Sequence, residues 1–428
     1  VYASSEDSLV PLGYSASSRI LWITDVEVND RGSVAARVQV VDPAAPVGGT
    51  AFAILRVAAP RSTSGVIGER IADTGSLLPG QTNLIESFGA SPFDLSINDA
   101  GEVSYTARFH QPPGIPRLSA AMVDQRVFFS TESPAPVVGR TWSTADWSPT
   151  FDRTAGGSYV LKARMDDTNL DTNGVVLVDG ELLAREGESL APPAISVLAS
   201  RDVDFNLRFL IGDNRVPVWA PYWADSVSTG GTAIVAGRRR VFGEGDRASD
   251  GRVITSVDRY QFAVSESGRF LISRCELGAG SVEAVALVDL SIGVESCAQP
   301  QLNSSGSAAR VFVSQASGIG DDDLRFTAGG LPPGAATLLL ASPTPGFVPS
   351  PGGSQGDLCL GAPVYRLVAE MGPADVTGAR SIGIDADGVL GSGVFPIPSG
   401  ETWHFQLWYR DQNPGPTSNF SSAVVVPF

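Results

Sequence analysis

The sequence predicts an all-β protein, in which a propeller-like array of about five four-stranded repeats is followed by a C-terminal β-sandwich. The first observation is a turn and an alternating strand, best seen in residues 97–107, of which variants recur between positions 20 and 300. The second is composition, because 47 Gly and 30 Pro in 428 residues favour turns and short strands. The third is the weakness of helical periodicity, for which residues 362–371 are a poor candidate.

Each repeat is organised around a pivot residue in its first turn. The pivots are Gly32, Gly101, Gly157, Asn214 and Gly268. The intervals between successive pivots are 69, 56, 57 and 54 (101−32, 157−101, 214−157, 268−214). Gly adopts positive φ without strain, and Asn is the residue that best replaces it there. The spacing therefore predicts repeated β-units, each with a tight turn at its pivot.

A second turn follows the later pivots at a steady distance. Asp124, Asp179, Ala236 and Asp289 begin these turns, at offsets of 23, 22, 22 and 21 from Gly101, Gly157, Asn214 and Gly268. The pair Asp179-Gly180 is a strong type I′ hairpin signal between two apolar strands. Two hairpins in about 55 residues make four strands, the size of one propeller blade. One such unit leaves an apolar face exposed, so neighbouring units are expected to pack on each other.

The chain divides into an N-terminal extension (1–20), a β-repeat domain (21–296) and a C-terminal β-sandwich domain (297–428). In the last domain, alternation predicts a strand with one buried face, formed by Trp403, Phe405, Leu407 and Tyr409. The first residues lack an initiator Met and are polar, which is typical of a mature secreted chain whose signal peptide has been removed.

Two sets of motifs resemble known families. The pattern Asn98-Asp99-Ala100-Gly101 with its following strand resembles the tandem Asn-x-x-Gly-x-x-x-Phe repeats of secreted bacterial proteins of unassigned function. This resemblance spans positions 20–300, where only the first two repeats keep the Asn-Asp pair. The ordered segments 303–306, 330–334, 352–361 and 400–411 resemble a C-terminal β-domain common on secreted proteins of planctomycetes and related environmental bacteria.

These resemblances imply an extracellular location and no known activity. The C-terminal resemblance also implies a disulfide, because Cys297 and Cys359 match the positions of that family's paired cysteines. Cys275 is then expected to be free.

Charge and hydropathy limit the possible partners. The formal net charge of −16 argues against nucleic acid. No apolar run approaches the roughly 18 residues of a membrane span. Acidity suits a surface that stays in solution or one that gathers calcium, for which the run Asp321-Asp322-Asp323 is the candidate. The alternative for this run is a solvated turn, and no other cofactor is predicted.

Catalytic signals are weak. Residues 352–356 match the Gly-x-Ser-x-Gly nucleophile pattern around Ser354, but the strand and helix that should flank it are missing. His110 and His404 are the two histidines, and neither has a companion at metal or triad spacing. We therefore expect no enzymatic activity.

Aromatic residues near prolines form the candidate binding site. The set is Trp142, Trp147, Trp219, Tyr222 and Trp223. Aromatic rings outside the core stack on sugars or anchor protein interfaces. The alternative is that they cover the cores of the repeats.

The leading functional hypothesis is a non-enzymatic extracellular structural or adhesive protein that self-associates into a fibre or surface assembly. It rests on the tail strand around Val424–Val426, which lacks nearby charge and is expected to present an open edge to another copy. Residues 1–20 are the expected reaching element. The alternative is a carbohydrate-binding propeller that recognises extracellular polysaccharide. A hydrolase is third, and it requires paired carboxylates that face a shared cleft.

Overall fold

The computed structural model confirms the all-β class and describes most of the chain. The described residues are 14–427 except 16, 30, 44–49, 58–67, 89–94, 113–117, 138–139, 144–149, 167–173, 187–207, 225–229, 238, 266, 279–281, 298–299, 316–322 and 386–400. Within these ranges the regular elements are strands and one 3-10 turn, η2 (Pro351–Gly353). No helix in them is long and apolar enough to cross a membrane.

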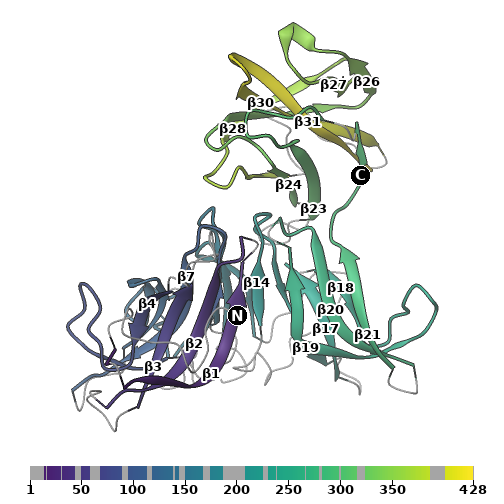
Figure 1. The fold of residues 1–428 in the computed structure, drawn as a ribbon. Helices are drawn as coiled ribbons and strands as arrows, with labels where there is room; N and C mark the ends of the chain where they lie inside the picture. Colours follow the sequence, from purple (N-terminus) through teal and green to yellow (C-terminus); the bar gives the residue numbers. More distant parts are fainter. Residues whose placement is uncertain are drawn as a thin grey trace.

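Five antiparallel sheets, here called sheets 1 to 5, follow one another in the described part of the chain between Arg19 and Asp289 (Figure 1). Sheet 1 contains β1 (Arg19–Val28), β2 (Val34–Val41), β3 (Thr50–Val57) and β4 (Gly68–Asp73). Sheet 2 contains β5 (Ile85–Phe88), β6 (Ser96–Ile97), β7 (Val103–Phe109), β8 (Leu118–Val123) and β9 (Arg126–Ser130). Sheet 3 contains β10 (Thr150–Arg153), β11 (Tyr159–Arg164), β12 (Gly174–Val178) and β13 (Glu181–Arg185).

Sheets 4 and 5 complete the series. Sheet 4 contains β14 (Phe209–Ile211), β15 (Pro217–Trp219), β16 (Tyr222–Ala224), β17 (Gly230–Ala236) and β18 (Arg239–Gly243). Sheet 5 contains β19 (Ile254–Val264), β20 (Phe270–Leu277) and β21 (Val282–Asp289). Four strands per unit is therefore correct for sheets 1 and 3 only. Sheets 2 and 4 have five strands because β5 and β6 both pair with β7, and β15 and β16 both pair with β17.

Sheet 5 lacks the fourth strand that the repeat predicts after Asp289. Among the described residues, its order is β19-β20-β21. After β21 the chain leaves the sheet, because Ile292 bridges to Val313 and the next strand pairs in the C-terminal part.

Four of the five pivots adopt the backbone conformation that the sequence predicts. Gly32, Gly101, Gly157 and Gly268 have φ angles of 76°, 81°, 95° and 76° in the turn between two paired strands. In the fourth repeat the positive φ angle lies one residue later than predicted, at Arg215 (φ 60°) and not at Asn214. The side chain of Asn214 instead accepts a hydrogen bond from the N–H of Val216 and donates to the carbonyl of Gly268.

Neighbouring sheets pack through shared apolar clusters. One cluster joins sheets 1 and 2, a second joins sheets 2 and 3, a third joins sheets 3 and 4, and a fourth joins sheets 4 and 5. Side-chain amides add polar links, since Asn29 donates to the carbonyl of Asn98 (2.7 Å) and Asn98 donates to that of Thr154 (3.3 Å). The repeats thus bury the faces that each unit would otherwise expose.

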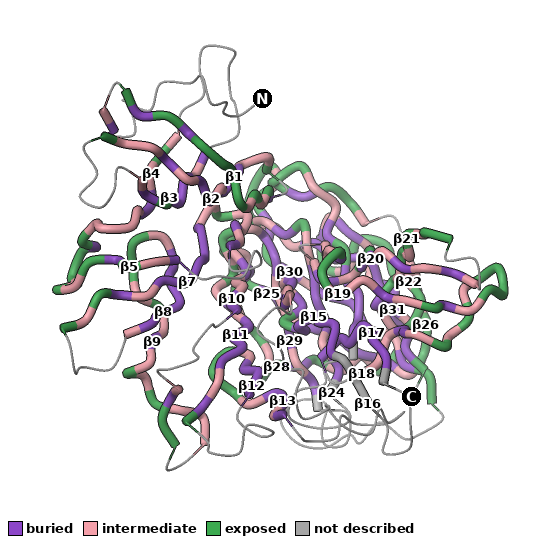
Figure 2. Tube along the Cα trace, turned by 90° about the horizontal axis from the view of Figure 1, so that it is seen from below, coloured by how far each residue is buried: buried purple, intermediate pink, exposed green. Residues whose placement is uncertain are grey.

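A closed propeller is not shown. Among the described residues, no apolar cluster joins sheet 5 to sheet 1. Figure 2 shows β1 exposed along much of its length, at one end of the succession of sheets. The first and last sheets therefore each share an apolar cluster with one neighbouring sheet only.

The C-terminal part contains two sheets packed on each other and a small third sheet. The five-stranded sheet has the order β22 (Val294–Ser296), β31 (Pro416–Pro427), β30 (Thr402–Gln412), β25 (Ala336–Ser342) and β28 (Tyr365–Pro373). The three-stranded sheet has the order β23 (Arg310–Gln315), β24 (Asp323–Gly329) and β29 (Arg380–Asp385), and β26 (Pro345–Val348) pairs with β27 (Leu358–Leu360). One cluster fills the space between the two larger sheets and includes the predicted buried face of β30.

Two expectations about this part need correction. The tail strand is not an open edge, because Val424 pairs with Glu295 of β22 on one side and with Phe405 of β30 on the other. The C-terminal sheet also begins at Val294, three residues before the expected boundary.

A disulfide joins Cys297 to Cys359 with Cα atoms 6.2 Å apart, and Cys275 is buried and free.

Candidate functional site

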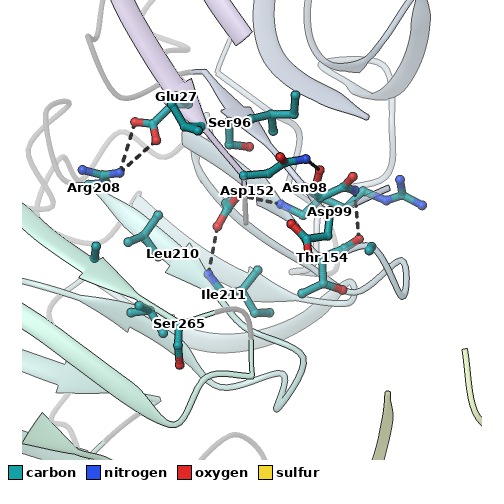
Figure 3. Close-up of a pocket in the computed structure, with 17 residues that line it drawn as sticks. Glu27, Ser96, Asn98, Asp99, Asp152, Thr154, Arg208, Leu210, Ile211 and Ser265 are labelled. Carbon is teal, nitrogen blue, oxygen red and sulfur yellow. Dashed lines mark hydrogen bonds and ion pairs between the residues drawn. The ribbon is translucent and has the colours of Figure 1, made fainter. Parts of the chain in front are cut away.

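A small polar pocket lies where β1, β6, β10, β14 and β19, one strand from each of the five sheets, approach one another (Figure 3). Five lining residues stand five positions before the positive-φ residue of their repeat (32−5, 101−5, 157−5, 215−5, 268−5), namely Glu27, Ser96, Asp152, Leu210 and Ala263. The cavity volume is about 180 Å³. Since a water molecule occupies roughly 30 Å³, this is room for a few waters or a small solute.

Asp152 anchors sheet 4 to sheet 3. Its Oδ2 accepts a hydrogen bond of 2.9 Å from the N–H of Ile211, and its Oδ1 accepts one of 2.9 Å from the N–H of Arg153. Burial raises the pKa of Asp152 above its ordinary value, although both backbone bonds act in the opposite direction. The carboxyl group is therefore held in place by the backbone of two sheets.

Glu27 links sheet 1 to the chain that enters sheet 4. Arg208 Nη2 donates to both carboxylate oxygens of Glu27, at 3.1 and 3.3 Å. Burial raises the pKa of Glu27 to about 7, and the charge of Arg208 partly opposes this shift. On the same strand, burial raises the pKa of Asp25 to about 6 against the charge of Arg37.

Three carboxyl groups line this one cavity, those of Glu27, Asp99 and Asp152. A group that titrates near neutral pH, such as Glu27, is suited to accept or donate a proton. The cavity is smaller than the roughly 300–1,000 Å³ of most ligand pockets. Among the described residues, no group of three or more His, Cys, Asp or Glu side chains is placed to hold a metal ion. Asp321 and Asp322 lie outside the described residues, as does the side chain of Asp323.

A larger cleft separates sheet 1 from sheet 5. Its volume is about 560 Å³. Asp25 and Glu27 line it from β1, and Tyr260, Ile272 and Val285 line it from sheet 5. The walls therefore combine carboxylates on one side with aromatic and aliphatic side chains on the other.

Two residues of the predicted aromatic binding site, Trp142 and Trp219, are buried and cannot contact a ligand. Trp142 is 2% exposed and meets Phe129 edge to face at 5.1 Å. Trp219 is fully buried, stacks on Phe209 at 5.5 Å, and donates its indole N–H to the carbonyl of Gly237. Both rings cover repeat cores, which corrects the binding-site prediction for them.

The side chains of the other three residues of the predicted binding site lie outside the described residues. Trp147 lies outside the described residues. Tyr222 and Trp223 belong to β16, but their side chains also lie outside the description.

The three residues behind the weak catalytic signals, Ser354, His404 and His110, lie apart from the pocket. Ser354 follows η2 in a loop, is buried, and donates its hydroxyl to the carbonyl of Ser418 at 3.0 Å. His404 lies in β30, where burial lowers its pKa. His110 is exposed just after β7.

Sequence reasoning missed Glu27, Asp152 and Arg208. The first two share one position relative to the pivot, so the repeat register could have brought them together. Arg208 has no such signal, because it precedes β14 and reaches the pocket from outside the repeated pattern.

Comparisons with known proteins give no family. No protein-family model and no curated protein matches the chain. Among solved structures, it is similar to the tetra-tandem repeat in the extending region of a large adhesion protein, with 11% identity over 93% of this chain and 90% of that chain. The TM-score is 0.14, and this likeness supports no conclusion about fold or function.

Proposed function

We propose that the protein is a non-enzymatic extracellular structural or adhesive protein, whose copies associate head to tail into a fibre or surface assembly. One observation carries the proposal: β1 in the first sheet, and β20 and β21 in the last sheet, each expose apolar side chains on the side away from the neighbouring sheet. Large exposed apolar patches are typical of interaction surfaces.

The face on sheet 1 lies opposite its contact with sheet 2. Ile23, Val26 and Val28 of β1 are 49%, 49% and 57% exposed. Ile23 pairs with Val38, which packs in a cluster separate from the one shared with sheet 2. Because directly paired residues share a face of a sheet, this strand exposes apolar side chains on the side away from sheet 2.

The face on sheet 5 lies opposite its contact with sheet 4. Val285 and Leu287 of β21 are 73% and 71% exposed, and Phe270 and Ile272 of β20 are 41% and 47% exposed. Ile272 pairs with Leu287, so these side chains share one face. The neighbouring Leu271 instead packs in the cluster with sheet 4.

The two faces favour an open assembly. Within one chain, each sheet packs on the next through apolar side chains, so sheet 5 of one copy can contact sheet 1 of another in the same way. Two different surfaces then meet in a heterologous contact, which generates a filament unless the rotation happens to close. The disulfide and the motif resemblances support an oxidising, extracellular setting.

Sedimentation velocity over a range of concentrations tests the proposal. We expect the native chain to form concentration-dependent oligomers and Leu287→Glu to shift it to monomers. Phe347→Glu is the matched control, since Phe347 is 67% exposed but lies in the C-terminal part. A native chain that stays monomeric at high concentration, or equal effects of both variants, would contradict the proposal.

A carbohydrate-binding propeller remains the second candidate, and the cleft between sheets 1 and 5 favours it. Tyr260 is 37% exposed beside Gln261 and Arg274, and carboxylates line the opposite wall. Aromatic and polar side chains in one cleft suit sugar rings. Binding of a polysaccharide that is lost in Tyr260→Ala, with the protein monomeric, would place this function first.

A hydrolase is the third candidate, because Glu27 and Asp152 line one cavity. If this function holds, Glu27→Gln should abolish a hydrolytic activity of the native chain while the fold is retained. Hydrolysis that is equal in both proteins, or absent from both, would argue against it.

A further inference from the structure

A separate cavity, in the C-terminal part, lies at one end of the five-stranded sheet. Its volume is about 580 Å³, within the roughly 300–1,000 Å³ of most ligand pockets. It forms where β25 begins, β30 ends and β31 begins, and its wall is completed by residues 332–335 and Ser304. Pro333, Gln412 and Pro416 in this wall are exposed, so the cavity is open to solvent.

The side chain of Asp411 is fixed in this wall by the backbone. Only 4% of the residue is exposed, and its Oδ1 accepts hydrogen bonds from the N–H of Ser304 at 3.0 Å and from that of Gln412 at 2.8 Å. The other oxygen, Oδ2, is buried and has no hydrogen-bond partner among the described residues. Leaving a buried acceptor unpaired is unfavourable, so this atom indicates a further partner, which is either water or a ligand.

The other polar groups of the wall restrict what this ligand is. Arg410 and Gln412 are exposed there, and the guanidinium carbon of Arg410 lies 5.2 Å from the centre of the Trp408 ring. A carboxylate only accepts hydrogen bonds and a guanidinium only donates them, whereas an amide does both. A ligand that pairs with all of these groups must therefore both donate and accept hydrogen bonds.

This requirement disfavours simple ions. An ammonium group donates to Asp411 but accepts nothing from Arg410, whose positive charge repels it. A carboxylate or phosphate group is attracted to Arg410 but repelled by Asp411, and the net charge of −16 adds to this repulsion. A hydroxyl group donates, accepts and carries no charge.

We propose that this cavity binds a neutral saccharide through two neighbouring hydroxyl groups. One hydroxyl donates to Oδ2 of Asp411, and the next accepts a hydrogen bond from Arg410. The wall also supplies apolar surface for the C–H groups of a sugar ring, from Pro332, Pro333 and Pro416.

The burial of Oδ2 strengthens this contact. A hydrogen bond that is shielded from bulk water is electrostatically stronger than one at the surface. Arg410 and Gln412, on either side of Asp411 in the chain, are exposed, and exposed side chains change rotamer within nanoseconds. They can therefore adjust as the hydroxyl approaches Oδ2.

This site is distinct from the surfaces discussed for the repeats. The proposed assembly joins sheet 5 of one copy to sheet 1 of another, and the larger cleft lies between these two sheets. The residues that line the present cavity all follow β21 in the chain and belong to the C-terminal part. The inference thus does not rest on self-association.

Ligand-observed NMR titration of the full chain tests the inference, with glucose, galactose, mannose and xylose as probes. We expect at least one of these sugars to bind and Asp411→Asn to weaken its binding about tenfold. The amide of this variant keeps one oxygen for the two backbone N–H groups but replaces the free acceptor by a donor. Arg410→Met, at an exposed position, should weaken binding as well. Asp357→Asn and Arg366→Met, in the C-terminal part but outside the cavity, are the matched controls and should bind as the native chain does.

A native chain that binds none of the four sugars would overturn the proposal, and Oδ2 would then hold only water. Equal affinity in the native chain and Asp411→Asn would overturn the assignment to this cavity. Binding that is lost in Tyr260→Ala alone would do the same, because the sugar would then occupy the cleft between sheets 1 and 5. Displacement of the sugar by methylammonium or inorganic phosphate would contradict a neutral ligand. Sedimentation of Asp411→Asn measures self-association separately and should match the native chain.

Discussion

Single residues fix the turns on which the repeated sheets depend. At Gly157 the φ angle is 95°, a region that disfavours side chains branched at Cβ. A Cβ at this position would meet only Arg153 Nη2 at 3.5 Å, an ordinary contact, so the backbone angle and not crowding requires glycine.

The first prediction therefore concerns Gly157→Val. We expect it to lower the free energy of unfolding by about 1–3 kcal/mol, as measured by chemical denaturation. Gly157→Asn should cost less, because asparagine tolerates positive φ better. Equal losses in the two variants would show that crowding, not φ, is responsible.

The second prediction concerns buried carboxyl groups. Burial raises the pKa of Asp25 to about 6 and that of Glu27 to about 7. Burial also raises the pKa of Asp213 to about 7, with the charges of Asp375 and Asp99 adding to the shift. The folded chain thus holds protons that the unfolded chain releases near pH 4. This stabilisation is complete below about pH 4 and is lost as the pH rises through 6 to 7.

Thermal unfolding provides the measurement for these groups. We expect a higher Tm at pH 5 than at pH 8, and a smaller difference in Glu27→Gln and Asp213→Asn. Glu181→Gln, on the exposed start of β13, is the control and should leave the difference unchanged. A Tm that rises from pH 5 to pH 8 in the native chain would contradict the assignment.

At the scale of elements, turns could be predicted from sequence because their causes are local. Asp179-Gly180 forms the expected two-residue turn, with φ angles of 52° and 88°, and Asp179 Oδ1 accepts the N–H of Tyr159. Asp124 also has a positive φ and accepts the N–H of Val103. Such bonds lie within one repeat, so a recurring pattern is enough to find them.

Elements that depend on distant partners could not be predicted in this way. The expected fourth strand of sheet 5 is missing from the described residues because the chain after Asp289 pairs with the C-terminal sheets. The pocket ion pair Glu27–Arg208 joins residues 181 positions apart.

The third prediction concerns the disulfide between the start of the C-terminal part and β27. It closes a loop with a sequence separation of 62 residues. In the chain-entropy model, such a crosslink stabilises by roughly 4 kcal/mol. We expect the double variant Cys297→Ala/Cys359→Ala to lose stability of this order in denaturant unfolding. Unchanged stability, or a disulfide mapped between Cys275 and Cys297, would contradict the prediction.

At the scale of the whole molecule, the order of the sheets decides which surfaces remain uncovered. Each internal sheet shares an apolar cluster with both of its neighbours, whereas sheets 1 and 5 each share one with a single neighbouring sheet. The repeat pattern predicts that units pack in series, but it does not say whether the series closes. The apolar side chains on the two end faces therefore became visible only in the structure.

Cysteine cross-linking between copies tests the head-to-tail contact most directly. Val26→Cys places a thiol on the face of sheet 1, and Leu287→Cys places one on the face of sheet 5. Under mild oxidation, a mixture of the two variants is predicted to form mixed disulfide dimers faster than either variant alone forms dimers. Mixed dimers that form no faster than the same-variant dimers, or that are absent, would contradict a contact between sheet 5 of one copy and sheet 1 of the next.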